Sequence, residues 1–404
     1  MPLNRQQRWE AGDRIPGFTV RSTSLDKYQI DSVAGRYIIL TFFGSAAIPK
    51  NMQAIRHICA KREMLDEKFA AFFGVSIDPS DEATARVAQS VPGIRFFWDF
   101  DQKISRLCGA IPENSNPDLQ ANEGTVYHPF TLILDPMLRV MKHIPLTSAE
   151  EHNRVFDAFM ASLPPVDGYA SVPTHAPVLV LPRVFEPAFC RELMALYDAD
   201  GGMDSGFMRE INGKTVTITD HTRKRRNDVY LGMEGKHADM CAAIRARLIA
   251  RLVPEVKRAF QFEITRMERY VVSRYDSADG GFFNAHRDNT TMGTAHRQFA
   301  CSINLNAEEY EGGDLRFPEF GSKTYRAPTG GAVVFSCSLL HEATTVTRGV
   351  RYAFLPFFYN EAAAALRKQN AHVLTGEVID KNKGEDESML STASPSSDAG
   401  SSLP

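Results

Sequence analysis

Several features that would place this chain in a specialised class are missing from it. Its six cysteines are scattered, with no Cys-x-x-Cys pair and no dense disulfide framework, so most should be small buried hydrophobic residues in a reducing compartment. It has no apolar run of about 18 residues or more, so no membrane span is expected. The first residues are polar, so we expect no secretory signal and a cytoplasmic protein. The net charge of -3 gives no overall attraction to nucleic acid or to an anionic membrane.

The remaining composition is that of an ordinary globular protein, with 43% hydrophobic and 24% charged residues. A length of 404 residues predicts two domains with separate cores. We expect a first domain over 9–165, a linker over 166–177, a second domain over 178–368 with its core at 266–360, and a disordered tail over 369–404.

The most informative stretch runs from Tyr275 to Phe358. It contains His286-Arg-Asp288, and residues i and i+2 of a strand point to one face, so these two side chains can bind a single ion. His341 follows an apolar run and would complete a set of two imidazoles and one carboxylate. That set suits a non-haem Fe(II) centre with open coordination positions. Taken alone, the His286-x-Asp288 pattern favours a turn or core histidine over a metal ligand.

The surroundings of His341 favour the metal site. The run from Gly331 to Leu340 is apolar and predicts a strand, Gly349 permits a tight turn, and Arg351 opens the next strand. A guanidinium binds a carboxylate through two parallel hydrogen bonds, which a lysine cannot do.

This ordered pattern resembles the catalytic core of the Fe(II)/2-oxoglutarate oxygenases, in their prolyl 4-hydroxylase-like branch, over roughly residues 178 to 360. The resemblance implies a double-stranded β-helix of the jelly-roll or cupin type with buttressing helices. It implies His286, Asp288 and His341 as iron ligands and Arg351 as the partner of the far carboxylate of 2-oxoglutarate. It also implies Fe(II) as cofactor, 2-oxoglutarate as cosubstrate and ascorbate as an accessory.

The roles of two further residues stay open, and two residues compete for roles already given. The resemblance implies that Tyr275 and Asn304 contact the cosubstrate, and the alternatives are a half-buried strand tyrosine and a sheet-edge asparagine. Arg348 competes with Arg351 for the carboxylate but falls in the turn. His296 competes with His341 as third ligand, and its loop predicts a surface residue.

The activity implied by the resemblance is hydroxylation of an unactivated C–H bond with O2, releasing succinate and CO2. The substrate would be a prolyl or other amino-acid side chain of a protein or peptide, or a small molecule. The alternatives are a non-catalytic two-domain binding or scaffold protein, a metal dioxygenase that needs no 2-oxoglutarate, and a thiol peroxidase or redoxin that uses a displaced cysteine.

The first domain alternates strands with helices, which favours an α/β sheet covered on its faces. We expect strands at 37–43, 69–76, 94–98, 131–134 and 138–141, and helices at 49–66, 81–89, near 103 and at 149–163.

This order resembles the thioredoxin fold in its peroxiredoxin or redoxin form. Pro129 matches that family's cis-proline, but Ala47 and Lys50 stand where redox thiols would be. Neither Cys59 nor Cys108 lies at a predicted helix N-terminus, where the dipole would lower its pKa. We therefore expect a redox-inactive domain that binds a protein partner or substrate.

Three segments of the second half complete the prediction. Amphipathic helices are expected from Pro187 onward and over 236–260, as packing elements. The basic run Arg223–Arg226 is interpreted as a solvated face or a lip for an acidic substrate, with nucleic-acid contact disfavoured.

Overall fold

The computed structural model describes residues 9–112, 126–382, 391–392 and 401–402. The chain divides into two compact units, one formed by Met1–His175 with Pro318–Ser322 and the other by Ala176–Phe317 with Lys323–Pro404. Within the described ranges, no helix is long and apolar enough to cross a membrane.

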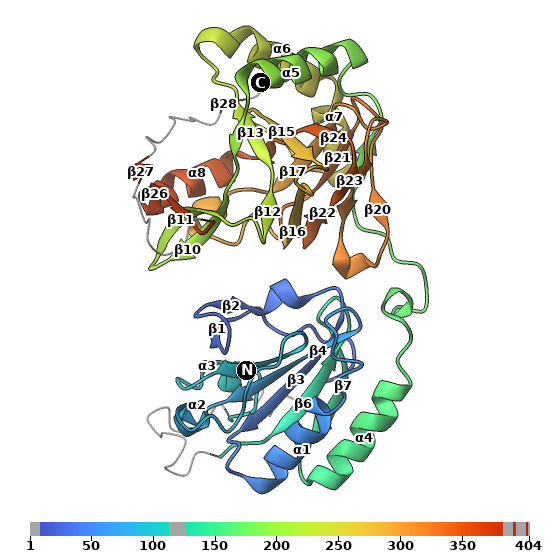
Figure 1. Ribbon diagram of the computed structural model, residues 1–404, viewed down its shortest axis with the longest axis vertical. Helices are drawn as coiled ribbons and strands as arrows, with labels where there is room; N and C mark the ends of the chain where they lie inside the picture. Colours follow the sequence, from blue (N-terminus) through green and yellow to red (C-terminus); the bar gives the residue numbers. More distant parts are fainter. Residues whose placement is uncertain (1–8, 113–125, 383–390, 393–400, 403–404) are drawn as a thin grey trace. The chain divides into compact units, whose positions relative to one another are not determined.

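The first unit is built on one mixed sheet with the strand order β2-β1-β5-β4-β3-β6-β7 (Figure 1). Strands β3, β4 and β5 run parallel, and β6 and β7 continue the sheet antiparallel. The strands are β1 (Thr19–Ser22), β2 (Tyr28–Gln29), β3 (Tyr37–Gly44), β4 (Ala70–Ser76), β5 (Ile94–Trp98), β6 (Phe130–Leu134) and β7 (Val140–Pro145). The predicted strands are confirmed, with β7 starting later than expected.

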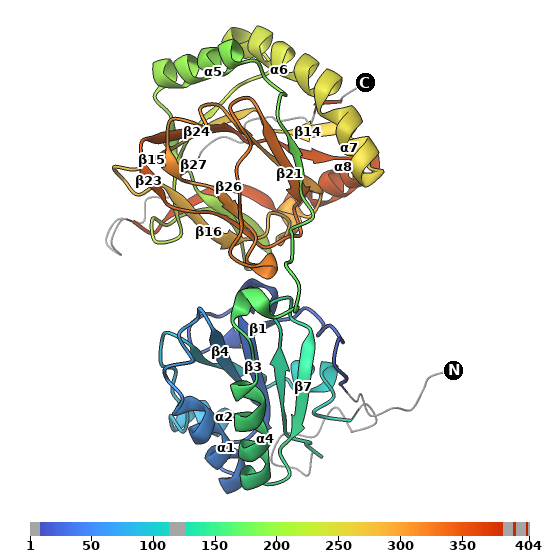
Figure 2. The same ribbon diagram turned by 90° about the vertical axis from the view of Figure 1, so that its right-hand side faces the viewer.

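The helices of the first unit are η1 (Ile30–Val33), α1 (Pro49–Cys59), α2 (Pro79–Ala83), α3 (Lys103–Leu107), α4 (Ala149–Ala161) and η2 (Val166–Gly168), and η5 (Pro318–Phe320) groups with them. Helices α1 and α4 lie side by side and share a core with the sheet (Figures 1 and 2).

Two predicted helices in this unit are too long. Helix α1 ends at Cys59 rather than 66 because the chain turns back there and buries Leu65 in the core. Helix α2 ends at Ala83 rather than 89, since Ala85 adopts a positive φ of 50°, which a right-handed helix cannot continue.

The second unit contains two facing sheets. The larger has the order β28-β14-β25-β17-β24-β15-β13-β9, with β21 and β8 joined to β17, and the smaller has the order β12-β16-β22-β19-β20. Phe283 and Ala343 of the smaller sheet pack against Tyr275 of the larger, so the sheets enclose a shared interior.

The strands of the larger sheet are β8 (Leu179–Leu181), β9 (Met203–Asp204), β13 (Asn227–Tyr230), β14 (Arg266–Glu268), β15 (Val271–Asp276), β17 (Phe299–Asn304), β21 (Ala332–Ser336), β24 (Val350–Phe354), β25 (Phe357–Tyr359) and β28 (Ser401–Ser402). Those of the smaller are β12 (Lys224–Arg225), β16 (Phe282–His286), β19 (Leu315–Arg316), β20 (Thr324–Tyr325) and β22 (His341–Ala343). Two flanking sheets comprise β10 (Phe207–Ile211), β11 (Lys214–Thr219), β26 (Leu374–Asp380) and β27 (Ser391–Thr392), and β18 (Glu311–Gly312) with β23 (Val346–Arg348).

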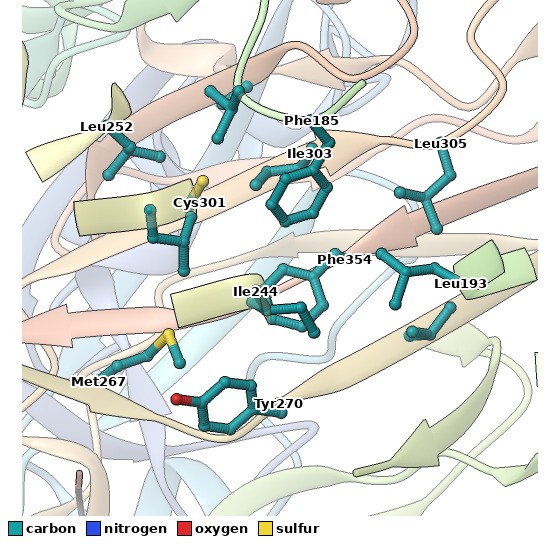
Figure 3. Close-up of a cluster of buried hydrophobic side chains, with 14 of the residues drawn as sticks. Phe185, Leu193, Ile244, Leu252, Met267, Tyr270, Cys301, Ile303, Leu305 and Phe354 are labelled. Atoms are coloured by element: carbon teal, nitrogen blue, oxygen red, sulfur yellow. The ribbon is translucent and has the colours of Figure 1, made fainter. Parts of the chain in front are cut away.

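The outer face of the larger sheet is covered by helices α5 (Pro187–Asp200), α6 (Ala238–Arg251) and α7 (Val253–Phe260), as Figure 2 shows. Leu193 of α5 and Ile244 of α6 meet Phe354 of β24 in this core (Figure 3). The single helix predicted over 236–260 is wrong in one respect. It breaks near Leu252, because Pro254 cannot donate a hydrogen bond within a continuous helix and instead sits in the first turn of α7.

Alternation along the strands decides what faces the interior between the sheets. Val272 of β15 and Ile303 of β17 belong to the helix-covered core, so their neighbours in sequence point the other way. Val334, Phe354 and Phe358 belong to the same core. The alternate positions of these five strands hold buried polar and aromatic residues: Ser273, Tyr275, Ser302, Asn304, Phe335, Arg351 and Phe357. The layer between the two sheets therefore contains buried polar side chains, and we call this layer the chamber.

The disordered tail predicted over 369–404 is wrong in its first part. After α8 (Glu361–Gln369) and η6 (Asn370–Val373), strand β26 runs parallel to β11. Backbone pairing at a sheet edge does not require an apolar sequence, which is why a polar composition failed to predict it. Residues 383–390, 393–400 and 403–404 of the predicted tail lie outside the described residues, as do 1–8 and 113–125. The remaining described elements are the short helices η3 (Gly235–His237) and η4 (Met292–Thr294).

Candidate metal centre

Two strands of the smaller sheet bring the three predicted metal ligands together. His286 ends β16 and His341 begins β22, and the two residues are antiparallel Cα partners. Asp288 follows β16 by two residues, and its backbone N–H donates to Cys337 O at 3.0 Å. Side chains 55 residues apart in sequence thus face one another because of strand pairing.

The geometry of the three side chains suits one ion. Their ligand atoms all lie within 4.8 Å of one another. His286 Nε2 lies 3.5 Å from Asp288 Oδ1, and His341 Nε2 lies 3.3 Å from Asp288 Oδ2. Among the described residues, this is the cluster of His, Cys, Asp and Glu side chains arranged to hold a metal. A set of three ligands leaves further coordination positions open.

Both imidazoles are oriented by a backbone carbonyl. His286 Nδ1 hydrogen-bonds Asn284 O at 2.8 Å, and His341 Nδ1 hydrogen-bonds Leu339 O at 3.0 Å. A carbonyl oxygen only accepts, so Nδ1 carries the proton in each ring and the Nε2 lone pair is free to bind a metal. This is the donor chemistry that a metal ion needs, so the residues present fit the predicted ion.

Aromatic neighbours restrict the rotation of both rings. Phe283 stacks on His286 with centroids 3.6 Å apart, and Phe335 meets His341 edge-on at 4.6 Å. The two imidazole centroids are 4.3 Å apart. These contacts hold the ligand atoms in place without the help of an ion.

Electrostatics also favours the metal-binding protonation states. Burial lowers the pKa of His341 to about 4, outweighing the opposing influence of Asp288, so the imidazole is neutral at pH 7. Burial alone would raise the pKa of the Asp288 carboxyl, but the two histidines and Arg297 hold it below its usual range. A neutral imidazole beside an ionised carboxylate is ready to bind a divalent cation.

Arg351 lies on β24, on the interior face of the larger sheet, and is only 2% exposed. Its Nη2 donates to Ser302 Oγ at 2.8 Å, while its Nε, a buried donor, has no partner. No carboxylate of the described residues pairs with it. A buried guanidinium without an anion is costly, so this arrangement points to an anionic ligand.

The other two predicted cosubstrate contacts differ in their surroundings. Tyr275 is buried beneath Arg351, whose guanidinium carbon lies 4.9 Å from the ring centroid, so the half-buried alternative is wrong. Asn304 is also buried, and its amide donates to Ala327 O at 2.7 Å. It ends β17, which lies within the larger sheet, so the sheet-edge alternative is wrong as well.

The two competing residues each pair with a glutamate instead. Arg348 is exposed and donates to Glu311 Oε1 at 2.5 Å. His296 was predicted at the surface, but it is 2% exposed and its Nε2 lies 2.7 Å from Glu268 Oε2. That prediction is wrong because Glu268 supplies a hydrogen-bond partner, which offsets the free-energy cost of burying the imidazole.

Sequence reasoning missed a buried network beside the site. Lys224 and Arg226 are 3% and 5% exposed, so half of the basic run is interior rather than a solvated face. Arg226 Nη2 donates to Asp228 Oδ2 at 2.6 Å, and its Nη1 to Tyr275 OH at 3.4 Å. The sequence contains a signal for this network: Lys224, Arg226 and Asp228 alternate with other residues, and side chains at every second position of an extended segment point the same way.

The positions of the first unit that would carry redox thiols are occupied by Ala47 and Lys50. Ala47 is exposed just before α1, and Asp81 Oδ2 accepts from Ala46 N–H at 2.9 Å, so a carboxylate rather than a thiolate sits at that helix N-terminus. Burial raises the pKa of Cys59 to about 12, and burial also raises that of Cys108. The cis-proline expected at Pro129 is wrong, since the cis bond in the described residues is Val91–Pro92.

Comparison with known proteins agrees with the metal centre. Residues 270–359 match the family model of the 2OG-Fe(II) oxygenase superfamily. A PKHD-type hydroxylase of Stenotrophomonas maltophilia is 28% identical over 152 residues, covering 35% of this chain and 68% of that protein. The chain spans 39% of the length of the PKHD-type hydroxylases of Synechococcus, at 30% identity over 89 residues.

Two solved structures cover different halves of the chain. A Pseudomonas putida prolyl-4-hydroxylase covers 48% of this chain and 96% of its own, with 17% identity and a TM-score of 0.34. A peroxidoxin of Mycobacterium tuberculosis covers 39% and 99%, with 16% identity and a TM-score of 0.33. From the family match and the hydroxylase relatives together, the second half of this chain resembles the Fe(II)- and 2-oxoglutarate-dependent oxygenases, with residues 270–359 as the part that matches their superfamily.

Proposed function

We propose that the second unit is an Fe(II)- and 2-oxoglutarate-dependent hydroxylase that acts on an unactivated C–H bond and releases succinate and CO2. The observation that carries this proposal is the convergence of His286, Asp288 and His341 in the same chamber as Arg351, a buried cation without an anion. The superfamily match over 270–359 supports the same reading.

Each residue has a defined share of the work. The two Nε2 atoms and the Asp288 carboxylate would hold the iron, which when bound supplies the activation of O2. Arg351 would bind the far carboxylate of 2-oxoglutarate, with Ser302 fixing one end of its guanidinium. Tyr275, whose ring lies 4.9 Å from the guanidinium carbon of Arg351, and Asn304, on the same strand as Ser302, would contact the cosubstrate.

The substrate is proposed by analogy with the relatives. The PKHD-type hydroxylases and the prolyl-4-hydroxylase of Pseudomonas putida suggest a prolyl or other amino-acid side chain. Ascorbate would serve as an accessory reductant. We further propose a double-stranded β-helix for the second domain, over 178–368, and a thioredoxin-like first domain, over 9–165, that binds a partner without thiol chemistry. Six free cysteines fit a reducing compartment such as the cytoplasm.

The test is anaerobic addition of Fe(II) and then 2-oxoglutarate to the full chain, followed by admission of O2. We expect a charge-transfer absorption band, and then succinate release that His341→Ala abolishes and that His372→Ala, a change of an exposed histidine, leaves intact. Oxygen uptake that needs no 2-oxoglutarate would favour a different metal dioxygenase. Absence of both the band and any oxygen uptake would favour a binding or scaffold protein.

A further inference from the structure

The chamber around the metal centre holds more positive charge than its own carboxylates neutralise. Its cations stack on rings of the chamber: Arg351 and Arg226 on Tyr275, Lys224 on Phe283, and Arg269 and Arg297 on Phe357. With Lys224 protonated, five cations thus face three carboxylates, Asp228, Glu268 and Asp288, which leaves a surplus of two positive charges. A bound Fe(II) and a doubly charged 2-oxoglutarate cancel each other, so their arrival leaves the surplus unchanged.

Pairing shows which cations carry the surplus. Arg226 is neutralised by Asp228, and Arg297 by two hydrogen bonds to the Glu268 carboxylate. Arg351 is already assigned to the cosubstrate. Arg269 pairs with no carboxylate in the described part of the chain, and its Nε is a buried donor without a hydrogen-bond partner.

Several contacts place Arg269 beside the metal ligands. Its guanidinium carbon lies 4.3 Å from the centroid of Phe357, and that of Arg297 lies 4.2 Å from the same ring. Gln298, the residue after Arg297, accepts from Cys337 N–H at 2.9 Å, and Cys337 O in turn accepts from Asp288 N–H at 3.0 Å. Arg269 therefore shares one region with the iron site, while being distinct from the Arg351 end.

The backbone of Arg269 is in an unfavourable conformation that directs its side chain away from the helix-covered core. It lies between β14 and β15 with φ of 54°, in the left-handed region. The bend lets Met267 and Tyr270 both reach the helix-covered core, so the two residues between them are turned to the other side. Glycine or asparagine would make this bend at lower cost, and a strained arginine suggests that its charge is used.

Lys224 adds a second donor to this part of the chamber. It is buried, its amine donates only to neutral oxygens, Ser205 Oγ and Gly206 O, and it lies 4.9 Å from the centroid of Phe283, the ring that stacks on His286. Burial and the neighbouring arginines hold the pKa of Lys224 well below its ordinary value. An anion bound nearby would stabilise its protonated form.

We propose that Arg269, assisted by Lys224, forms a second oxyanion subsite, so that the substrate of this enzyme carries a carboxylate or phosphate group near the C–H bond that reacts. The assignment of this subsite to the substrate rests on the proposed hydroxylase function. It goes further by separating this chain from an enzyme whose substrate is a neutral prolyl ring without an adjoining anion.

The probe is inorganic phosphate, titrated calorimetrically into the full chain saturated with Mn(II), which prevents turnover, and with 2-oxoglutarate, which occupies Arg351. We expect the wild type to bind phosphate, Arg269→Gly to bind it at least about tenfold more weakly, and Arg269→Lys to retain part of the affinity. A parallel titration with acetate tells a carboxylate site from a phosphate site.

Two controls keep loss of fold apart from loss of the subsite. Arg269→Gly relieves the positive φ and should unfold at the same temperature as the wild type or higher. Gln261→Gly makes the same backbone change at an exposed residue with φ of 52°, and Arg348→Met removes an exposed cation. Both should bind phosphate as the wild type does.

The outcomes separate this inference from the proposed function. The subsite is overturned if the wild type does not bind phosphate, or if Arg269→Gly binds it with the same affinity as the wild type. The hydroxylase proposal still stands in that case, provided that 2-oxoglutarate binds. If 2-oxoglutarate itself does not bind, the hydroxylase proposal fails. The comparison of wild type with Arg269→Gly is then made on the metal-free protein, where equal phosphate affinity again overturns the subsite.

Discussion

Tyr275 and Arg351 are cross-strand partners on β15 and β24, and the guanidinium carbon of Arg351 lies 4.9 Å from the centroid of the tyrosine ring. Strand pairing therefore fixes both ends of the contact. The ring covers one side of the guanidinium, Ser302 binds Nη2, and the buried Nε has no partner, so it is left for a ligand.

The first prediction concerns this guanidinium. Arg351→Met should weaken 2-oxoglutarate binding by about 100-fold, since a buried charge-assisted pair contributes about 2–5 kcal/mol. Arg351→Lys should recover only part of this, because an ammonium cannot form two parallel hydrogen bonds. Titration under anaerobic conditions measures both, with the exposed Arg348→Met as a control. Full affinity in Arg351→Met would remove this residue from the cosubstrate site.

The second prediction concerns the ligand histidines. His341→Ala or His286→Ala should reduce Mn(II) affinity by at least about 100-fold, because each removes one of three ligands from a site with no replacement nearby. The exposed His372→Ala should change nothing. Equilibrium dialysis against Mn(II) gives the affinities. If either ligand variant kept the wild-type affinity, the metal would have to lie elsewhere.

The third prediction concerns the buried pair of Arg226 and Asp228. Asp228→Asn leaves a 5% exposed guanidinium without its counter-charge and should reduce the free energy of unfolding by about 3–5 kcal/mol. The double change Arg226→Met with Asp228→Leu should lose less than Asp228→Asn alone, because neither buried charge remains. Differential scanning calorimetry compares the two. Equal losses would mean that packing, not charge, dominates this position.

The sequence predicted those features whose interacting residues lie close together along the chain. His286 and Asp288 are two residues apart, and Gly349, with φ of 75°, makes the turn that its position before Arg351 predicts. Both features are local. The orientation of the imidazoles by Asn284 and Leu339 carbonyls is also local but has no side-chain signature.

What the sequence did not predict depends on partners distant in the chain. His296 is buried only because Glu268 lies opposite it, and Arg226 only because the chamber also holds Asp228 and Tyr275. Strand β26 forms because β11, some 160 residues earlier, offers a free edge. No window of sequence contains both members of these pairs.

The last prediction tests a buried acid of the first unit. Burial, partly offset by hydrogen bonds from the Ile104 and Ser105 backbone N–H groups, raises the pKa of Asp99 from 3.8 to about 6. A carboxyl with a raised pKa in the folded state stabilises the fold below its unfolded pKa, and this contribution is lost as the pH rises through about 6.

Between pH 4.5 and 7.5 the wild type should therefore lose about 2 kcal/mol of unfolding free energy more than Asp99→Asn, which does not titrate. Both tryptophans of the chain, Trp9 and Trp98, belong to the first unit, so their fluorescence in urea reports its unfolding separately from the second. The exposed Glu63→Gln serves as the control and should follow the wild type. Parallel pH profiles for wild type and Asp99→Asn would show that the Asp99 carboxyl titrates as it does in the unfolded chain, and that its burial carries no electrostatic cost.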